Sequence, residues 1–187
     1  MRIVELTDET KNNLLESLLK RSPNSYGQYE KTVNDIIGDV RARRDEALFE
    51  YTSKFDHCEM NAEKIRVTRE EIDEAYAQLE ENFIEVKHSA ENIRKFHQKQ
   101  MHNSWIVPED NGTILGQKIT PISISGVYVP GGKAAYPSSV LMNVLPAKVA
   151  GVSRIIMTTP PGKDGKVNPG TLVAADIAGV DEIYKVG

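Results

Sequence analysis

The sequence has little cysteine, no long apolar run and no excess of basic residues, and each shortage excludes a class of protein. One cysteine, Cys58, among 187 residues excludes an internal disulfide and is typical of a reducing cytoplasm. No stretch approaches the roughly 18 apolar residues of a membrane-spanning helix, and residues 1–8 lack the apolar core of a signal peptide. The 23 Lys and Arg residues are outnumbered by 27 Asp and Glu residues, giving a net charge of −4. We therefore expect a cytoplasmic protein that binds neither nucleic acid nor a membrane.

Glycine and proline are scarce in the first part of the chain and frequent in the second. Residues 1–110 hold 39 of the 50 charged residues but only two of the 13 glycines and two of the nine prolines. A charge-rich, glycine-poor stretch is typical of helices, whereas apolar runs separated by Gly and Pro are typical of alternating strands and helices. The composition predicts an α/β fold, with a helix-rich region at 1–110 and a sheet-containing region at 111–187.

Helical periodicity is clear in the first region. Apolar residues recur at helical spacing in three segments, which lie at 14–19, 33–40 and 47–54. The longest helix is expected to begin at Thr68, because Thr68 and Glu71 have the spacing of a capping box. The apolar stripe that follows continues to His97, which predicts one helix of roughly 30 residues with one buried side. Trp105 is expected to pack over the end of this helix.

Strands and helices are expected to alternate in the second region. The apolar runs predict strands at 113–119, 123–129, 154–159 and 182–186, with helices at 138–150 and 171–178. Pro146 should bend or interrupt the first of these helices, and Gly179 should end the second. The order β-α-β-α-β predicts a parallel sheet with right-handed crossovers.

The loop within residues 126–139 is the best candidate for a binding site. It joins a strand to a helix, and ligands of open parallel sheets bind outside the carboxyl ends of the strands. Gly131 and Gly132 would let a ligand approach the backbone closely. Ser138 or Ser139 could cap the helix, whose first amides favour a phosphate or carboxylate.

Two side chains of this loop could contact a ligand directly. Tyr128 offers a ring for stacking and a hydroxyl for hydrogen bonding, and Lys133 could neutralise an anion. The loop has neither the G-x-G-x-x-G spacing of a dinucleotide fingerprint nor a Walker A sequence, so a tight βα turn without a ligand remains the alternative. The four histidines are scattered, and no catalytic or metal-binding set of residues is visible.

Several motifs, in order along the chain, resemble the histidinol dehydrogenase family. The strongest are Gly126-Val127-Tyr128-Val129-Pro130-Gly131-Gly132, Tyr136-Pro137-Ser138-Ser139-Val140-Leu141-Met142-Asn143 and Gly179-Val180-Asp181-Glu182-Ile183-Tyr184-Lys185-Val186-Gly187. The resemblance covers nearly the whole chain and is loosest in the first 30 residues. It implies that the region 111–187 is the first part of a Rossmann-like domain, which would be incomplete here.

The resemblance also implies an activity. Enzymes of this family oxidise L-histidinol to L-histidine through histidinaldehyde in two NAD-linked steps, with a zinc ion that positions the substrate, and they form homodimers. It implies that Tyr128 contacts NAD, that Pro130, Gly131 and Gly132 form the surrounding loop, and that Ser138 lies near the substrate. The family's zinc ligands and its Glu-His acid/base pair match no residue of this chain, so no metal ligand or catalytic residue is assigned.

Two functional hypotheses follow from the sequence. In the first, the chain is the N-terminal part of a histidinol dehydrogenase that continues past Gly187, and it is inactive alone. In the second, the short chain is a non-catalytic module for nucleotide binding or oligomerisation.

Overall fold

The structure is a computed structural model that describes residues 5, 7, 10–11, 27–131 and 136–187. The leucine-rich helix expected at 14–19 lies outside the described residues, as do Gly132 and Lys133. The chain divides into two compact units, 1–47 and 48–187. The helix α3 (Asp45–Asp56) spans the division and confirms the helix expected at 47–54.

The described part of the first unit consists mainly of the helix α2 (Gly27–Arg43), which confirms the helix expected at 33–40. Glu30 lies in its first turn, and Arg41 and Arg43 lie in its last turn, so these charges complement the helix dipole. One turn apart, Arg43 and Asp39 form a two-pronged ion pair, with Nε–Oδ1 and Nη2–Oδ2 distances of 2.7 and 2.6 Å.

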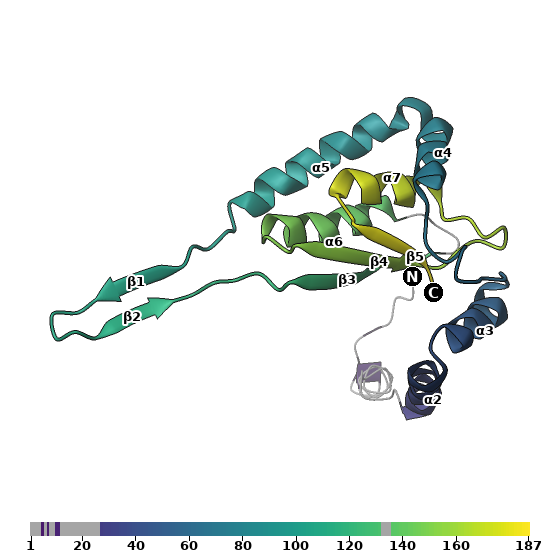
Figure 1. The fold of residues 1–187 in the computed structure, drawn as a ribbon, viewed down its shortest axis with the longest axis horizontal. Coiled ribbons are helices and arrows are strands. Elements are labelled where there is room, and N and C mark those ends of the chain that lie inside the picture. The colour runs from purple at the N-terminus through teal and green to yellow at the C-terminus, as the bar shows by residue number, and fades with distance from the viewer. Residues whose placement is uncertain (1–4, 6, 8–9, 12–26, 132–135) are drawn as a thin grey trace. The chain divides into compact units, whose positions relative to one another are not determined.

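The second unit is built on a parallel sheet of three strands (Figure 1). These are β3 (Ile124–Tyr128), β4 (Arg154–Thr159) and β5 (Glu182–Lys185), hydrogen-bonded in the order β3-β4-β5. The helices α6 (Pro137–Val149) and α7 (Pro169–Ala178) connect them. The predicted β-α-β-α-β order and the α/β fold class are therefore confirmed.

Helices α6 and α7 cover one face of the sheet (Figure 1), and the core lies between these helices and the strands. Alternate strand residues, such as Ile155 and Met157 on β4, are fully buried, whereas their neighbours are partly accessible. Leu145 on α6 and Val173 on α7 are also fully buried. The burial of this apolar surface is the main force that stabilises the unit.

The sequence predicts the end of α7 correctly but not the start of α6. Gly179 ends α7 in the left-handed conformation, with φ = 89°, as predicted. Pro146 lies inside α6 and does not interrupt it. The predicted cap at Ser138 or Ser139 is wrong, because the helix begins at Pro137 and both serines lie in its first turn.

The single long helix expected from Thr68 to His97 is wrong in one respect, because the structure divides it into two. Thr68 does form the predicted capping box with Glu71, at the start of α4 (Arg69–Leu79). A turn of 3-10 helix, η1 (Glu80–Asn82), then separates α4 from α5 (Phe83–Gln98). Glu80 has φ = 50°, which no α-helix accommodates, and the break lets both helices pack against α7.

The strand β2 (Ile114–Gln117) confirms the strand expected at 113–119, but its partner β1 (Trp105–Pro108) was not predicted. The two form an antiparallel hairpin in which every residue is exposed. The expected position of Trp105 over the helix end is therefore wrong: it pairs with Gln117, and its Nε1 donates a hydrogen bond to the Gln117 side chain at 3.3 Å.

The composition change near residue 110 lies inside this hairpin, and the proposed domains 1–110 and 111–187 stay a prediction. Among the residues that the structure describes, no helix has the length and apolar character needed to span a membrane.

Candidate binding site at the sheet edge

The carboxyl ends of the strands and the N-terminal ends of α6 and α7 lie at the same edge of the sheet (Figure 1). The strand pairing extends one residue past β3, since the Val129 N–H donates to the Thr158 carbonyl at 2.9 Å. Beyond it the loops after β3 and β4 come together. A Cβ atom on Gly131 would lie only 2.6 Å from Cγ of Pro160, so only glycine fits this contact without movement.

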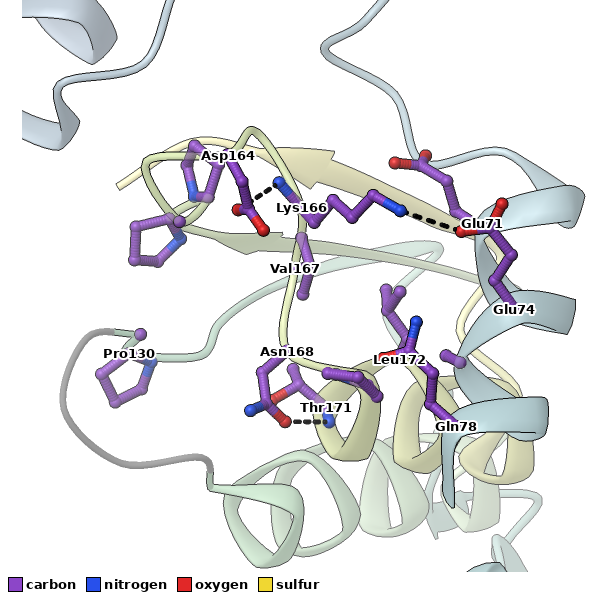
Figure 2. Close-up of a pocket in the computed structure, with 16 residues that line it drawn as sticks. Glu71, Glu74, Gln78, Pro130, Asp164, Lys166, Val167, Asn168, Thr171 and Leu172 are labelled. Carbon is purple, nitrogen blue, oxygen red and sulfur yellow. Dashed lines mark hydrogen bonds and ion pairs between the residues drawn. The ribbon is translucent and has the colours of Figure 1, made fainter. Parts of the chain in front are cut away.

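A cavity of about 330 Å³ opens beside these loops (Figure 2). Three prolines supply much of its apolar wall: Pro130 after β3, and Pro160 and Pro161 after β4. The first turn of α7 contributes Thr171 and Leu172. This volume lies within the range of small-molecule sites, and its position matches that expected for ligands of an open parallel sheet.

The first turn of α7 is already capped by the protein itself. The Asn168 side-chain oxygen accepts hydrogen bonds from the N–H groups of Gly170 and Thr171, at 2.9 and 3.4 Å. The first helical residue is Pro169, which has no N–H to offer. Because these donors are already taken or missing, the end of α7 is a poor site for a phosphate group.

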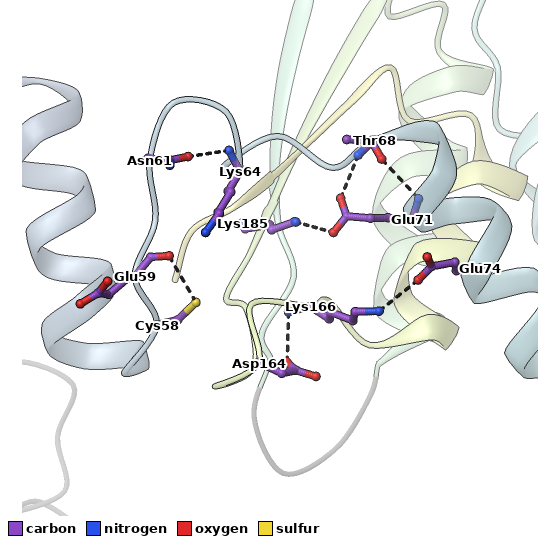
Figure 3. Close-up of polar contacts among 10 residues, drawn as sticks. All are labelled: Cys58, Glu59, Asn61, Lys64, Thr68, Glu71, Glu74, Asp164, Lys166 and Lys185. Atoms are coloured by element: carbon purple, nitrogen blue, oxygen red, sulfur yellow. Dashed lines mark hydrogen bonds and ion pairs between the residues drawn. The ribbon is translucent and has the colours of Figure 1, made fainter.

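The helix α4 forms the opposite side of the cavity and is held to the sheet edge by ion pairs (Figures 2 and 3). Lys166 donates to Glu74 at 3.0 Å, and this contact raises the pKa of the lysine. Lys185, at the end of β5 and only 5% exposed, donates to Glu71, which also completes the capping box with Thr68.

A second set of contacts joins α4 to α7 directly. Asp176 accepts hydrogen bonds from Arg69 at 2.7 Å and from the Tyr76 hydroxyl at 2.8 Å. Burial, with a further contribution from Asp176, raises the pKa of Tyr76 to about 12, so the phenol stays protonated and donates at physiological pH. The walls of the cavity are thus fixed relative to one another by side chains about 100 residues apart in sequence.

The structure places the sequence-predicted residues in different parts of this edge. Pro130 and Gly131 line the cavity. Tyr128 is 57% exposed and lies between the buried Val127 and Val129, so its side chain projects from the face of the sheet opposite theirs. Ser138 lies in the first turn of α6 and does not line the cavity. The loop therefore offers two neighbouring surfaces, the cavity and the exposed ring of Tyr128.

Thr171, Asn168 and Gln78 also line the cavity, and the sequence reasoning missed them. Asn168-Pro169 is a recognisable helix start, so Asn168 could have been found from the sequence. Gln78 comes from α4, and no local pattern relates that helix to α7. Among the described residues, no three His, Cys, Asp or Glu side chains lie close enough together to hold a metal ion.

Comparison with known proteins gives a consistent result. The family model described as histidinol dehydrogenase matches residues 19–187. The chain is 53% identical over 173 residues to a histidinol dehydrogenase of Clostridium acetobutylicum. That alignment covers 92% of this chain and 40% of the relative. The chain is 52% identical over 171 residues to the histidinol dehydrogenase of Bacillus subtilis, with 90% and 40% coverage. The chain thus spans about 40% of the length of these relatives, in their N-terminal portion.

A solved structure agrees with these sequence matches. The crystal structure of a histidinol dehydrogenase from Elizabethkingia anophelis superposes with a TM-score of 0.76 at 32% identity. The superposition covers all of this chain and 39% of that one.

Proposed function

We propose, from the premise that the chain belongs to the histidinol dehydrogenase family, that it supplies the NAD-binding part of an enzyme that oxidises L-histidinol to L-histidine through histidinaldehyde. One observation carries the proposal: a ligand-sized cavity lies at the carboxyl edge of the parallel sheet, and residues of the matched loop, Pro130 and Gly131, line it. NAD, when bound, accepts a hydride from the substrate.

The residues of this chain would bind and orient the cofactor. Tyr128 presents an exposed ring on which a flat heterocycle can stack, and its hydroxyl has no hydrogen-bond partner among the described residues. Pro130 and Gly131 follow Tyr128 closely in the chain and line the cavity, so a dinucleotide that lies along the loop would contact both the ring and the cavity. Ser138, exposed in the first turn of α6, is proposed to lie near the substrate.

Zinc is the second cofactor implied by the resemblance, and the described residues do not fit it. They hold no cluster of three metal-binding side chains, and zinc needs three or four such ligands. No step of the proposed reaction is therefore assigned to zinc bound by residues of this chain. With histidinol, NAD and zinc present, we expect the chain alone to produce no NADH, and measurable turnover would show that catalytic residues within it have been missed.

Replacing Tyr128 tests the cofactor assignment. A stacking ring contributes about 0.5–1.5 kcal/mol beyond its buried area, so Tyr128→Ala should weaken NAD binding about tenfold, measured by calorimetry. Tyr128→Phe keeps the ring and should retain most of the affinity. Tyr29, on α2 in the first unit, is a matched control because it too is an exposed tyrosine. Equal NAD affinities in Tyr128→Ala and Tyr29→Ala would remove Tyr128 from the site.

Association is the second candidate function, and the hairpin of β1 and β2 favours it. Its large apolar side chains are strongly exposed, with Ile106 at 74% and Ile114 at 70%. A two-stranded hairpin is only marginally stable in water unless its apolar side chains are covered. We propose the homodimer that the resemblance implies. Light scattering on the parent chain and on an Ile106→Ser, Ile114→Ser variant tests it: a monomeric parent would contradict the proposal.

A further inference from the structure

Lysines from three segments of the chain line a second cavity, which we call the lysine cavity. Its volume is about 400 Å³, within the range of small-molecule sites. It shares Glu71, Asp164 and Lys166 with the cavity of Figure 2, but none of the described prolines lines it. Its lysines are Lys64, Lys163, Lys166 and Lys185. Four lysines against three carboxylates give this cavity a positive balance, although the net charge of the chain is −4.

Two of these lysines are held in ion pairs (Figure 3). Lys185 contacts one carboxylate oxygen of Glu71, and Lys166 contacts Glu74 at 3.0 Å. The other oxygen of Glu71 accepts the Thr68 N–H at 2.9 Å. Because both oxygens of Glu71 are engaged, this carboxylate fixes α4 to the sheet edge and is not free to neutralise a further lysine.

The other two lysines have no partner. Among the described residues, neither Lys64 nor Lys163 takes part in an ion pair or a side-chain hydrogen bond. Asp164 is engaged with the Lys166 N–H at 3.1 Å, and Glu59 directs its carboxylate away from the lysines drawn in Figure 3. Two unpaired cations in one cavity wall repel each other unless an anion lies between them.

Both unpaired lysines lie on turns that are closed by hydrogen bonds. The Lys64 N–H donates to the Asn61 side chain at 2.9 Å. Lys163 lies in the turn 162–165, whose last N–H donates to its first carbonyl at 2.8 Å. The two turns are connected through Cys58, since a Cβ atom on the last residue of 162–165 would lie 3.5 Å from the Cys58 Sγ. The backbone therefore holds both cations at the cavity before any ligand arrives.

We propose that the lysine cavity binds a phosphate group, free or carried by a small organic molecule, with Lys64 and Lys163 as binding residues. A phosphate monoester carries about 1.5 to 2 negative charges at pH 7, which matches the two unpaired ammonium groups. Cys58 and Met60 add uncharged wall beside which the organic part of a ligand would lie. The proposal goes beyond the NAD assignment and does not depend on it.

The experiment titrates inorganic phosphate, glycerol phosphate, glycerol and acetate separately into the 187-residue chain and follows backbone amide signals by NMR. The ionic strength is kept constant, because salt screens exposed charges. We expect both phosphates, but neither glycerol nor acetate, to shift the amides of Cys58, Lys64 and Gly165. Tighter binding of glycerol phosphate would assign an organic phosphate as the ligand, and equal binding would assign the phosphate group alone.

Charge variants test the two binding residues. Lys64→Gln and Lys163→Gln should each weaken phosphate binding about fivefold, and Lys64→Arg should bind like the parent. Lys118→Gln is the matched control, because Lys118 is also an exposed lysine but does not line the cavity.

Several outcomes would overturn the proposal. They are no amide shifts with either phosphate, equal shifts with acetate, or unchanged phosphate affinity in a folded variant that carries both glutamine substitutions. NAD, a phosphodiester, is the last probe. If NAD shifts the amides of Cys58 and Gly165 as glycerol phosphate does, the lysine cavity is not a separate phosphate site.

Discussion

Adding a single methyl group at Gly131 tests how closely the two loops of the site are packed. In Gly131→Ala the new carbon would lie 2.6 Å from Cγ and 3.2 Å from the carbonyl oxygen of Pro160. Carbon atoms pack at about 3.5–4.0 Å, so the loops after β3 and β4 would have to separate by roughly 1 Å. The backbone of Gly131 is outside the left-handed region, so the clash and not the conformation is the cause.

The expected loss of stability follows from this overlap. Overpacking of a well-packed contact costs about 1–3 kcal/mol, and the substitution should lower the free energy of unfolding by that amount. Denaturation in urea measures it as a lower midpoint with an unchanged slope. NAD binding should weaken as well, because Pro160 forms part of the cavity wall and has to move.

Gly126→Ala is the matched control for this experiment. Gly126 lies in β3, the strand that leads into the loop, and a Cβ atom there would meet nothing within 4 Å. The same chemical change should therefore be neutral, or stabilise by about 0.4–1 kcal/mol through the unfolded chain. If Gly131→Ala is as stable as Gly126→Ala, the close contact with Pro160 does not exist in solution and the reasoning is refuted.

Two further predictions concern the core and the pH dependence of stability. Leu145 is fully buried, so Leu145→Ala should lower the free energy of unfolding by about 2–5 kcal/mol in urea denaturation; a loss under 1 kcal/mol would contradict its place in the core. Asp181 accepts hydrogen bonds from Lys148 and from the Ile155 N–H, which lower the pKa of its carboxyl group. Its contribution is therefore present above the ordinary carboxyl pKa and is lost as pH falls through the lowered value. Asp181→Asn should reduce the decline of stability below about pH 4, and an identical decline in both proteins would contradict this.

The sheet region could be predicted because its signals are local. The strand β4 and the helix end at Gly179 were both expected from short runs of apolar residues and from glycine. The capping box at Thr68 is equally local, since two residues three positions apart make both hydrogen bonds. In each case neighbouring residues determine the backbone, so a single sequence is sufficient.

The strand β1 could not be predicted in the same way. Its four residues, from Trp105 to Pro108, have no alternation between buried and exposed positions, because all of them are exposed. The pairing depends on Ile114–Gln117, across a turn that contains Gly112 with φ = 83°. Trp105 was therefore assigned to the nearest apolar surface along the chain, and the actual partner, Gln117, is set by the hairpin.

The sequence predicts the residues of only one wall of the cavity. The motif loop supplies Pro130 and Gly131, but the facing wall comes from α4 and α7, which are joined by contacts such as that of Tyr76 with Asp176. Such contacts, about 100 residues apart, leave no periodic pattern in either segment.

The break at Glu80 explains why α4 is available to form that wall. A continuous helix of 30 residues would extend for about 45 Å in one direction. The structure instead ends α4 at Leu79 and starts α5 at Phe83, so α5 packs along α6 and α7 while α4 packs against α7 beside the sheet edge. Tyr76 and Phe83 meet edge to face across the break, with ring centroids 5.4 Å apart. The apolar stripe therefore packs against the core along both helices, with Ala90 buried and its larger residues partly buried, but the change of direction is what brings Gln78 and Glu74 to the cavity.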